Sequence, residues 1–396
     1  MESSLPPHQT EWWPSHWKIR IIDRSMTACR MHIVTPAPIY GPTRAALPAN
    51  AIETGPAVAA KNKYYQGPPS EHFDGTRFFN PGHPDTDRSL GDILKWKLRE
   101  KSAKWPRSAP VDQSVPPPRS EPLRITMVGH ATLLIQAAGL NILTDPVWSD
   151  RASPVRFAGP RRVTITGIAF DDLPRIDAVL LSHNHYDHLD IATLGRLHER
   201  DRPLIVTPLG NDAIVRRHIA DARIATGDWG DRIDLGGETV VDIVPAHHWS
   251  ARGGGDRRMA LWGGFMLRSP AGLVYFAGDT GYGDGAIFRD MHALYGPPDV
   301  ALIPIGAYAP RWFMAAQHVD PDEAVRIMLD LGARSAIGIH WGSFHLTDEE
   351  RDEPVALLKE SLARRGIDPG RFPAAEPGQV FDMAGLDAGA KHRKPD

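Results

Sequence analysis

Residues 182–188, with the sequence SHNHYDH, concentrate side chains that bind metal ions. They follow an apolar run that is typical of a buried strand. At the extended end of a strand, residues two apart point to the same side, so His183 and His185 can present both imidazoles to one ion. Asp187 and His188 follow where the chain turns towards a helical pattern, and they can face the opposite side of the same pocket. This spacing predicts a site for two metal ions.

Three later apolar runs also end at a residue that could bind a metal. One run leads to the pair His247-His248, one to Asp279 between glycines, and one to His340. A site at the ends of buried strands is held by a rigid scaffold. With the first group, these residues supply five histidines and two carboxylates, enough for two ions with an open position for water. The spacing alone leaves open whether His247 or His248 is the ligand.

The elements that must position these side chains are short strands first and helices later. This order predicts two sheets packed face to face with helices outside. Asp320 is the expected N-cap of one helix, with Pro321 at its first position. The expected strands are 124–128, 132–136, 141–143, 178–181, 204–206, 239–244, 261–267, 273–277, 300–303 and 335–339, and the expected later helices are 190–200, 321–331 and 352–364.

The composition and the pattern of the sequence divide the chain into four parts. Residues 1–63 contain several prolines and predict an irregular, partly disordered extension. Residues 64–120 hold short motifs and a basic amphipathic helix at 91–105, before a proline-rich connector. Residues 121–385 form the expected catalytic domain, and residues 386–396 form a polar tail.

Composition excludes several classes of protein. The 396 residues have a net charge of −3, so no overall positive field suggests a nucleic-acid partner. The single cysteine, Cys29, excludes an internal disulfide and a cysteine-based zinc cluster. We see neither a transmembrane run nor a secretory leader, and we expect a cytoplasmic protein with the option of peripheral membrane contact.

The sequence resembles the metallo-β-lactamase superfamily, and within it the N-acylphosphatidylethanolamine-hydrolysing phospholipase D family with its bacterial relatives. The resemblance covers roughly residues 64–385. It implies an αββα sandwich with two mixed sheets. Besides residues 182–188, the motifs that carry it are 72–81 (HFDGTRFFNP), 129–132 (GHAT), 143–147 (LTDPV), 276–282 (FAGDTGY), 303–308 (IPIGAY), 310–314 (PRWFM), 317–321 (QHVDP) and 339–342 (IHWG).

The resemblance also implies a division of the ligands between two zinc ions, although iron or manganese could replace zinc in such sites. The family places its ligand immediately before a tryptophan, which favours His248 over His247. Asp279 is expected to bridge the two ions. One ion is assigned to His183, His185 and His248, and the other to Asp187, His188 and His340.

Further roles follow from the same resemblance. Asp187, Asp279 and His318 are the expected catalytic residues, with His318 orienting the substrate or protonating the leaving oxygen. Asp145 is expected to brace the metal loop through hydrogen bonds. His130 could lie near the site or be an ordinary buried histidine.

The implied reaction is hydrolysis of a phosphodiester by a hydroxide shared between the metals. N-acylphosphatidylethanolamine-like lipids would give phosphatidic acid and an N-acylethanolamine. The alternative is a lactonase or another small-molecule phosphodiesterase. A membrane surface is a candidate partner because Lys95, Lys97, Arg99, Lys101 and Lys104 accompany apolar residues on the 91–105 helix, and a dimer is compatible with the sequence.

Overall fold

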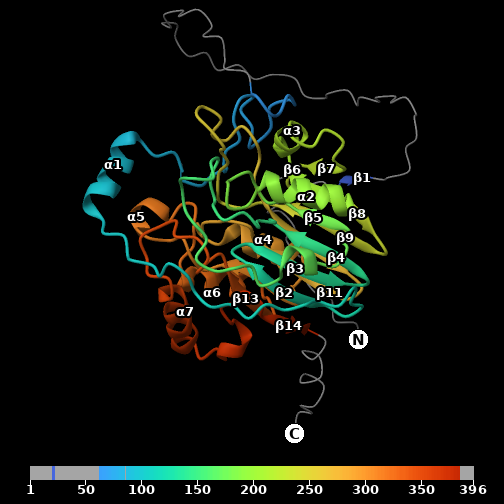
Figure 1. Ribbon diagram of the computed structural model, residues 1–396. Helices are drawn as coiled ribbons and strands as arrows, with labels where there is room; N and C mark the ends of the chain where they lie inside the picture. Colours follow the sequence, from blue (N-terminus) through green and yellow to red (C-terminus); the bar gives the residue numbers. More distant parts are fainter. Residues whose placement is uncertain (1–19, 23–61, 85, 384–396) are drawn as a thin grey trace, which may run out of the picture.

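The structure, a computed structural model, describes residues 20–22, 62–84 and 86–383. Two seven-stranded sheets lie face to face with helices on their outer surfaces, as Figure 1 shows. This is the expected αββα sandwich of the metallo-β-lactamase type. Apart from residues 20–22, 62 and 63, the expected N-terminal extension lies outside the described residues, as does the expected tail at 386–396. The strand at 20–22 pairs with the edge of one sheet.

The first sheet has the strand order β1-β8-β9-β10-β11-β12-β13. Strand β10 is antiparallel to both β9 and β11, whereas β11, β12 and β13 are mutually parallel. Four strands, β9, β11, β12 and β13, therefore run in one direction and end at the same edge. The strand bounds are β1 Arg20–Ile22, β8 Asp231–Gly236, β9 Thr239–Val244, β10 Gly264–Ser269, β11 Gly272–Phe276, β12 Val300–Pro304 and β13 Ser335–Ile339.

The second sheet has the order β14-β2-β3-β4-β5-β6-β7. Its first four strands are antiparallel neighbours, and β4, β5, β6 and β7 are parallel. The carboxyl ends of these parallel strands meet at one edge. The bounds are β2 Arg124–Gly129, β3 Thr132–Ala137, β4 Leu140–Thr144, β5 Ala178–Leu180, β6 Leu204–Pro208, β7 Ile224–Gly227 and β14 Val380–Asp382.

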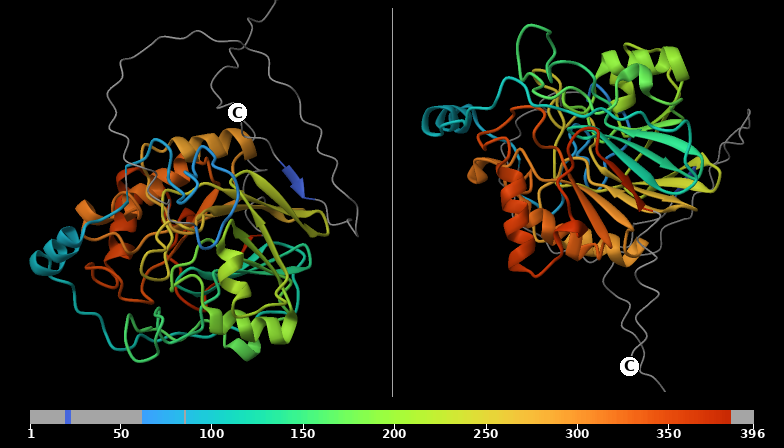
Figure 2. Two further views of the ribbon diagram at one scale, coloured as in Figure 1. Left: turned by 90° about the horizontal axis from the view of Figure 1, so that it is seen from above. Right: turned by 60° about the horizontal axis from the view of Figure 1, so that its bottom comes forward.

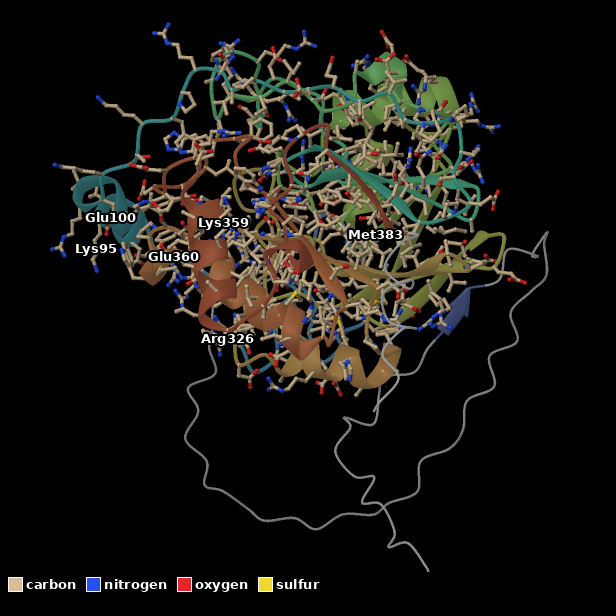
Figure 3. The ribbon with its side chains drawn as sticks, turned by 90° about the horizontal axis from the view of Figure 1, so that it is seen from below. Lys95, Glu100, Arg326, Lys359, Glu360 and Met383 are labelled. Carbon is tan, nitrogen blue, oxygen red and sulfur yellow. The ribbon has the colours of Figure 1, made fainter. Side chains whose placement is uncertain are left out.

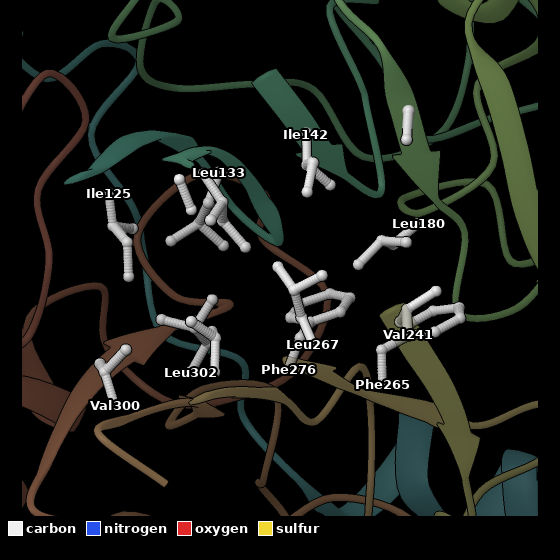
Figure 4. Packing of buried hydrophobic residues seen from close by; sticks show 14 of the residues in the cluster. Ile125, Leu133, Ile142, Leu180, Val241, Phe265, Leu267, Phe276, Val300 and Leu302 are labelled. Atoms are coloured by element: carbon white, nitrogen blue, oxygen red, sulfur yellow. The ribbon is translucent and has the colours of Figure 1, made fainter. Parts of the chain in front are cut away.

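Apolar side chains from the facing surfaces of the two sheets form the central core (Figure 4). Ile125 and Leu133 from the second sheet lie opposite Leu302 and Phe276 from the first, and all four are at most 1% exposed. The burial of apolar surface away from water is the main contribution that holds the sheets together, and it is worth about 25 cal/mol per Å². The core fixes the sheets relative to each other and thereby the edges at which their strands end.

Helices cover both outer surfaces (Figure 2). Helices α2 and α3 pack on the second sheet through residues such as Leu194 and Ile214. Helices α4, α6 and α7 pack on the first sheet through Phe288, Val325 and Leu358. The helix bounds are α1 Leu90–Arg99, α2 Ile191–Asp201, α3 Asn211–Arg216, α4 Ala286–Tyr295, α5 Arg311–Met314, α6 Pro321–Asp330 and α7 Glu353–Arg364, with 3₁₀ turns η1 Phe170–Asp172 and η2 Pro369–Arg371.

Most expected elements occur where the sequence predicts them. Helix α6 begins at Pro321, and Asp320 caps it by accepting a hydrogen bond from the Glu323 amide. Strand β10 begins three residues later than expected, because the amides of Leu261 and Gly263 donate to the carbonyls of Leu209 and Ser182 and not to β9. Helices α3, α4 and α5 and strands β1, β7, β8 and β14 were not predicted from the sequence.

The expected helix at 91–105 is wrong in its second half. Helix α1 ends at Arg99, and the chain continues in extended form from Glu100. The amide of Ala103 donates to the carbonyl of Asp348 at 3.0 Å, and Trp105 Nε1 donates to the carbonyl of Glu349 at 2.9 Å. The Ala103 amide therefore bonds to a distant segment instead of to a carbonyl of the helix, and the Trp105 indole attaches the chain to the same segment.

Among the side chains of α1 that the structure describes, Trp96 is the buried one, and it contacts Phe313 and Met314 of α5. Leu94 and Leu98 are 58% and 76% exposed. Figure 3 shows α1 at the edge of the molecule with Lys95 on it. The helix is therefore attached by one side and presents apolar and basic side chains on another. Among the described residues, no helix combines the length and apolar composition needed to cross a bilayer.

Candidate metal centre

The ends of four strands bring the metal-binding side chains together. The 182–188 motif follows β5 in the second sheet, whereas His248, Asp279 and His340 follow β9, β11 and β13 in the first sheet. Because these strands end at one edge of the sandwich, side chains far apart in sequence converge there. All seven candidate ligands predicted from the sequence lie in this cluster.

The first group contains His183, His185 and His248. Nε2 of His183 lies 2.9 Å from Nδ1 of His185, and Nε2 of His248 lies 3.2 Å from the same atom. Nitrogens that share one zinc ion at about 2.0–2.1 Å in tetrahedral geometry lie about 3.3 Å apart. The three nitrogens are therefore spaced closely enough to share one ion.

The second group contains Asp187, His188 and His340. Nε2 of His188 lies 3.1 Å from Nε2 of His340. Oδ2 of Asp187 lies 3.5 Å from Nε2 of His188 and 3.4 Å from Nε2 of His340. All three side chains are largely withdrawn from water. These atoms surround a second position at which a metal ion could bind, with distances between ligand atoms similar to those in the first group.

Asp279 lies between the groups. Its Oδ2 is 3.1 Å from Nε2 of His188, 3.8 Å from that of His183 and 3.7 Å from that of His248. Its Oδ1 is 3.1 Å from Nε2 of His340. The carboxylate is 3% exposed, so removing it from water without a cation nearby would be costly. Its position fits the bridging role that the family resemblance implies.

Hydrogen bonds fix which nitrogen faces the cluster in three of the histidines. Nδ1 of His188 donates to Asp145 at 2.7 Å, and Nδ1 of His248 donates to the Gln317 carbonyl at 3.0 Å. Ser182 Oγ donates to Asp145, so Nδ1 of His183 donates in turn to this hydroxyl at 2.9 Å. In each ring the proton sits on Nδ1, and Nε2 is left with the lone pair that a metal requires.

The protonation states of the first group and of the two carboxylates suit metal binding. Burial holds the pKa of His183 and His248 well below the ordinary value, and lowers that of His185 to about 4. Burial alone would raise the pKa of Asp187 and Asp279, but the surrounding histidines hold both well below the ordinary range. Neutral imidazoles and ionised carboxylates are the forms that bind divalent cations. Burial alone would lower the pKa of His188 and His340 too, but the neighbouring carboxylates raise that of His188 well above the ordinary value and that of His340 to about 9. A cation bound in the second position would displace the protons from these two rings, and with those protons released the residues fit two metal ions.

Asp145 has the bracing role expected from the sequence. Its Oδ1 accepts from the Ser182 amide at 2.7 Å, and Oδ2 accepts from Ser182 Oγ at 2.6 Å as well as from His188. The carboxylate is completely buried. It holds the start of the metal motif and one ring of the second group at the same time.

His130 lies at the site, and the sequence had left its place open. Its Nε2 is 3.0 Å from Oδ2 of Asp187, to which it donates, and its ring packs 3.9 Å from that of His340. His130, Asp145 and His340 have positive φ angles of 59°, 31° and 61°. Backbone strain of this kind gathers at functional sites, where surrounding contacts must hold it.

The structure distinguishes His248 from its neighbour His247. His247 stacks on His83 with ring centroids 3.8 Å apart and is absent from the cluster. A ring nitrogen of His318 lies within 4.8 Å of ligand atoms of Asp279 and His340, and its ring centroid is 5.1 Å from that of His248. Burial lowers its pKa to about 4, so a neutral ring faces the metal positions.

One residue that holds the first group in place, Asn80, was not predicted from the sequence. Asn80 belongs to the motif at 72–81, but no role could be read from its position. Its Nδ2 donates to the His248 carbonyl at 2.9 Å, and its Oδ1 accepts from Trp262 Nε1 at 3.1 Å. The N-terminal motif therefore packs directly behind a candidate ligand.

Comparisons with known proteins agree with this architecture. The family model of the β-lactamase superfamily domain matches residues 140–341. An N-acyl-phosphatidylethanolamine-hydrolyzing phospholipase D of Caenorhabditis elegans is 37% identical over 269 residues, which cover 65% of this chain and 75% of the relative. A metal-dependent hydrolase of Pyrobaculum calidifontis is 29% identical over 66% of this chain and its own full length.

Among solved structures, an isothiocyanate hydrolase from Delia radicum gut bacteria has a TM-score of 0.53 at 21% identity, over 65% of this chain and 98% of the other. At that identity the likeness concerns the fold alone. The family match, the relatives and the cluster of seven ligands at the sheet edge lead to one conclusion. The chain belongs to the metallo-β-lactamase superfamily and is a metal-dependent hydrolase that resembles the N-acylphosphatidylethanolamine-hydrolysing phospholipase D family.

Proposed function

We propose that the protein is a zinc-dependent phosphodiesterase that cleaves N-acylphosphatidylethanolamine-like lipids to phosphatidic acid and an N-acylethanolamine. The observation that carries the proposal is the pair of ligand groups that share Asp279. When bound, two such cations lower the pKa of water and neutralise charge on a phosphate oxygen. The similarity to a relative named for this reaction supports the substrate class.

The chain's own residues would prepare the site. Asp145, Gln317 and Ser182 hold three imidazoles with Nε2 towards the metal positions. The buried ring of His318 can donate a hydrogen bond to the substrate or pass a proton to the leaving oxygen. In the proposed scheme, Asp187 and Asp279 supply the negative charge that retains the cations.

Access to a lipid requires contact with a membrane surface. Helix α1 supports such contact, because the exposed Leu94 and Leu98 accompany Lys95 on a short helix at the edge of the molecule. A basic helix with an apolar face binds an anionic interface. We therefore propose peripheral membrane association for a cytoplasmic protein.

The test is product analysis. Purified protein loaded with zinc is incubated with vesicles that contain N-acylphosphatidylethanolamine, and the lipids are identified by mass spectrometry. We expect equimolar phosphatidic acid and N-acylethanolamine, lost on chelation. If this lipid stays intact while a lactone or a small phosphodiester is hydrolysed, the lipid assignment is wrong and the alternative hydrolase is supported.

A further inference from the structure

A pocket of about 770 Å³ adjoins the metal motif through Tyr186. Its walls come from residues 148–156, from the beginning of α2 and from Arg252. None of the seven candidate metal ligands is among its lining residues. The pocket is therefore distinct from the metal positions, although it shares the 182–188 loop with them.

The pocket is rich in positive charge. Four arginines line it, Arg151, Arg156, Arg196 and Arg252, against two carboxylates, Asp150 and Asp190. The Asp190 carboxylate is already engaged, because it accepts hydrogen bonds from two amides and one hydroxyl around the start of α2. In the part of the chain that the structure describes, no carboxylate forms an ion pair with the first two arginines or with Arg252; Arg196 reaches the exposed Asp171 at 3.8 Å.

Arg252 is the most enclosed of these cations. Its guanidinium donates to the carbonyls of Asn184 and Leu189 at 3.0 and 2.8 Å, and it lies over the Tyr186 ring at 4.0 Å. Carbonyl oxygens orient the group but carry no full negative charge. Burial lowers the pKa of Arg252 below its ordinary value, which shows the cost of this position for the cation. Asp190 and Asp256 offset part of this cost but form no ion pair with the guanidinium, so an anion in the pocket would supply a direct counter-charge.

We propose that this pocket binds the anionic phosphate group of a ligand, with Arg252 at its inner wall and Arg156 at its rim. Arginine suits this chemistry because its planar fork can bind two phosphate oxygens at once. The volume exceeds that of a phosphate ion and leaves room for the group that carries it. This inference does not depend on the proposed lipid hydrolysis, because it uses none of the metal ligands.

The rim of the pocket indicates the source of the phosphate. On either side of Arg156, Val155 and Phe157 are 37% and 85% exposed. An exposed aromatic ring beside a cation is the combination that enters the interface of an anionic bilayer. We therefore expect the phosphate to be the headgroup of a phospholipid rather than a free ion.

Two single substitutions on the same loop provide the test. Arg156→Gln removes a charge from the pocket, whereas Arg161→Gln removes the same charge from an exposed residue outside its lining. We measure co-sedimentation of the metal-loaded protein with phosphatidylcholine vesicles, with and without phosphatidic acid. Arg156→Gln should weaken binding to the phosphatidic acid vesicles about fivefold, and Arg161→Gln should leave it nearly unchanged. Equal effects of both substitutions would overturn the proposal, because they would indicate general attraction between charges.

A second pair of measurements separates the two sources of phosphate. Phe157→Ser should weaken vesicle binding and leave the binding of inorganic phosphate, measured by equilibrium dialysis, unchanged. Phosphate binding that is sensitive to Arg156→Gln, without any vesicle preference, would support the pocket with a free anion as its ligand. If Arg156→Gln changes neither measurement, the pocket is not a phosphate site. Hydrolysis of bis(p-nitrophenyl) phosphate by Arg156→Gln should equal that of the wild type, so failure here is distinguishable from failure of the proposed enzyme activity.

Discussion

The Asp279 carboxylate lies close to both groups: its Oδ2 is 3.8 and 3.7 Å from Nε2 of His183 and His248 in the first group, and 3.1 Å from Nε2 of His188 in the second. Every other candidate carboxylate or imidazole belongs to one group only. A change at this residue therefore affects both metal positions at once, whereas a change at His185 affects one.

We predict that Asp279→Ala is the most damaging single substitution among the ligands. The variant should lose both ions during dialysis and lose hydrolysis of a soluble phosphodiester, because no other side chain joins the groups. Elemental analysis measures the metal content. His185→Ala is the matched comparison and should retain one ion more readily. An Asp279→Ala protein with close to two ions and normal turnover would contradict the shared site.

We predict a different result for His318, which lies close to Asp279 and His340 but is not among the seven ligands that the family resemblance implies. His318→Ala should lower turnover about 10²–10⁴-fold, the range for a positioned acid–base group, while the metal content stays near two. His318→Gln keeps a hydrogen-bond donor but cannot exchange protons as imidazole does, so partial recovery in that variant would indicate an orienting role. Loss of an ion from either variant would make His318 a ligand.

At the residue scale, the sequence predicted the members of the cluster but not their supports. The spacing of His183, His185, Asp187 and His188 is local, so it is visible in seven residues. The contact between His130 and Asp187 spans 57 positions and depends on a turn with positive φ, which the sequence does not reveal. The link from Asn80 to His248 spans 168 positions, so it depends entirely on tertiary packing.

At the scale of the elements, the N-terminal motif at 72–81 supports the backbone of His248. Phe73 and Phe78 pack with Trp262 in a small aromatic core behind β9, and this core places Asn80 beneath the His248 carbonyl. The motif precedes the β-lactamase superfamily domain in the chain, yet it contacts the backbone of a candidate ligand.

We predict that Asn80→Ala lowers the affinity of the first metal group about 10–100-fold, the usual effect of removing a group that orients a ligand. Dialysis against graded chelator concentrations, followed by elemental analysis, measures this affinity. Asn141→Ala is the control, because Asn141 also donates its amide to distant carbonyls, those of Pro118 and Arg175, but lies outside the site. Equal loss of metal in both variants would indicate general destabilisation instead.

Helix α1 carries a separate prediction. Replacing Leu94 and Leu98 together by serine should weaken binding to anionic vesicles severalfold, because two exposed apolar side chains can no longer enter the interface. Hydrolysis of a soluble phosphodiester should not change. Leu329→Ser on α6 removes a leucine that is 47% exposed and serves as the control. Vesicle binding that persists in the α1 variant would assign membrane contact to another surface.

The helix boundaries show where sequence patterns stop being informative. The sequence of residues 91–105 predicts one basic amphipathic helix, but the helix ends at Arg99 and the Ala103 amide bonds to the carbonyl of Asp348 instead. By contrast, α6 begins where Asp320 and Pro321 predict, because a cap and a proline act locally. Among the missed elements, β7 has only four residues (IATG) and β8 is largely polar (DRIDLG), so both take their form from neighbouring strands.

At the scale of the whole molecule, the outer helices are also joined by charge. Asp322 at the start of α6 accepts hydrogen bonds from Ser361, Arg364 and Arg365 of the α7 region, at 2.7–2.9 Å. The hydrogen bond from Arg365, with the others, lowers the pKa of Asp322 below its ordinary value of 3.8. A carboxyl whose pKa is lower in the folded state stabilises the fold above its unfolded pKa and loses that effect as pH falls through the folded value.

We predict that Asp322→Asn lowers the denaturation midpoint at neutral pH, and that its difference from the wild type narrows below about pH 4, near the ordinary carboxyl pKa. The group is largely open to solvent, so we expect a small difference that decreases with added salt. Denaturant titrations at several pH values measure it. A difference that widens towards low pH would contradict the assigned direction of the pKa shift.

The candidate ligands come from both sheets, with the 182–188 loop on one and His248, Asp279 and His340 on the other. Cations held at this edge would therefore tie the two layers together, as a cross-link does in chains that contain disulfides. A ligand that binds only the folded state adds to the free energy of unfolding according to its concentration and affinity. The supply of metal in the cell would then determine both how fast the enzyme works and how long each molecule survives proteolysis.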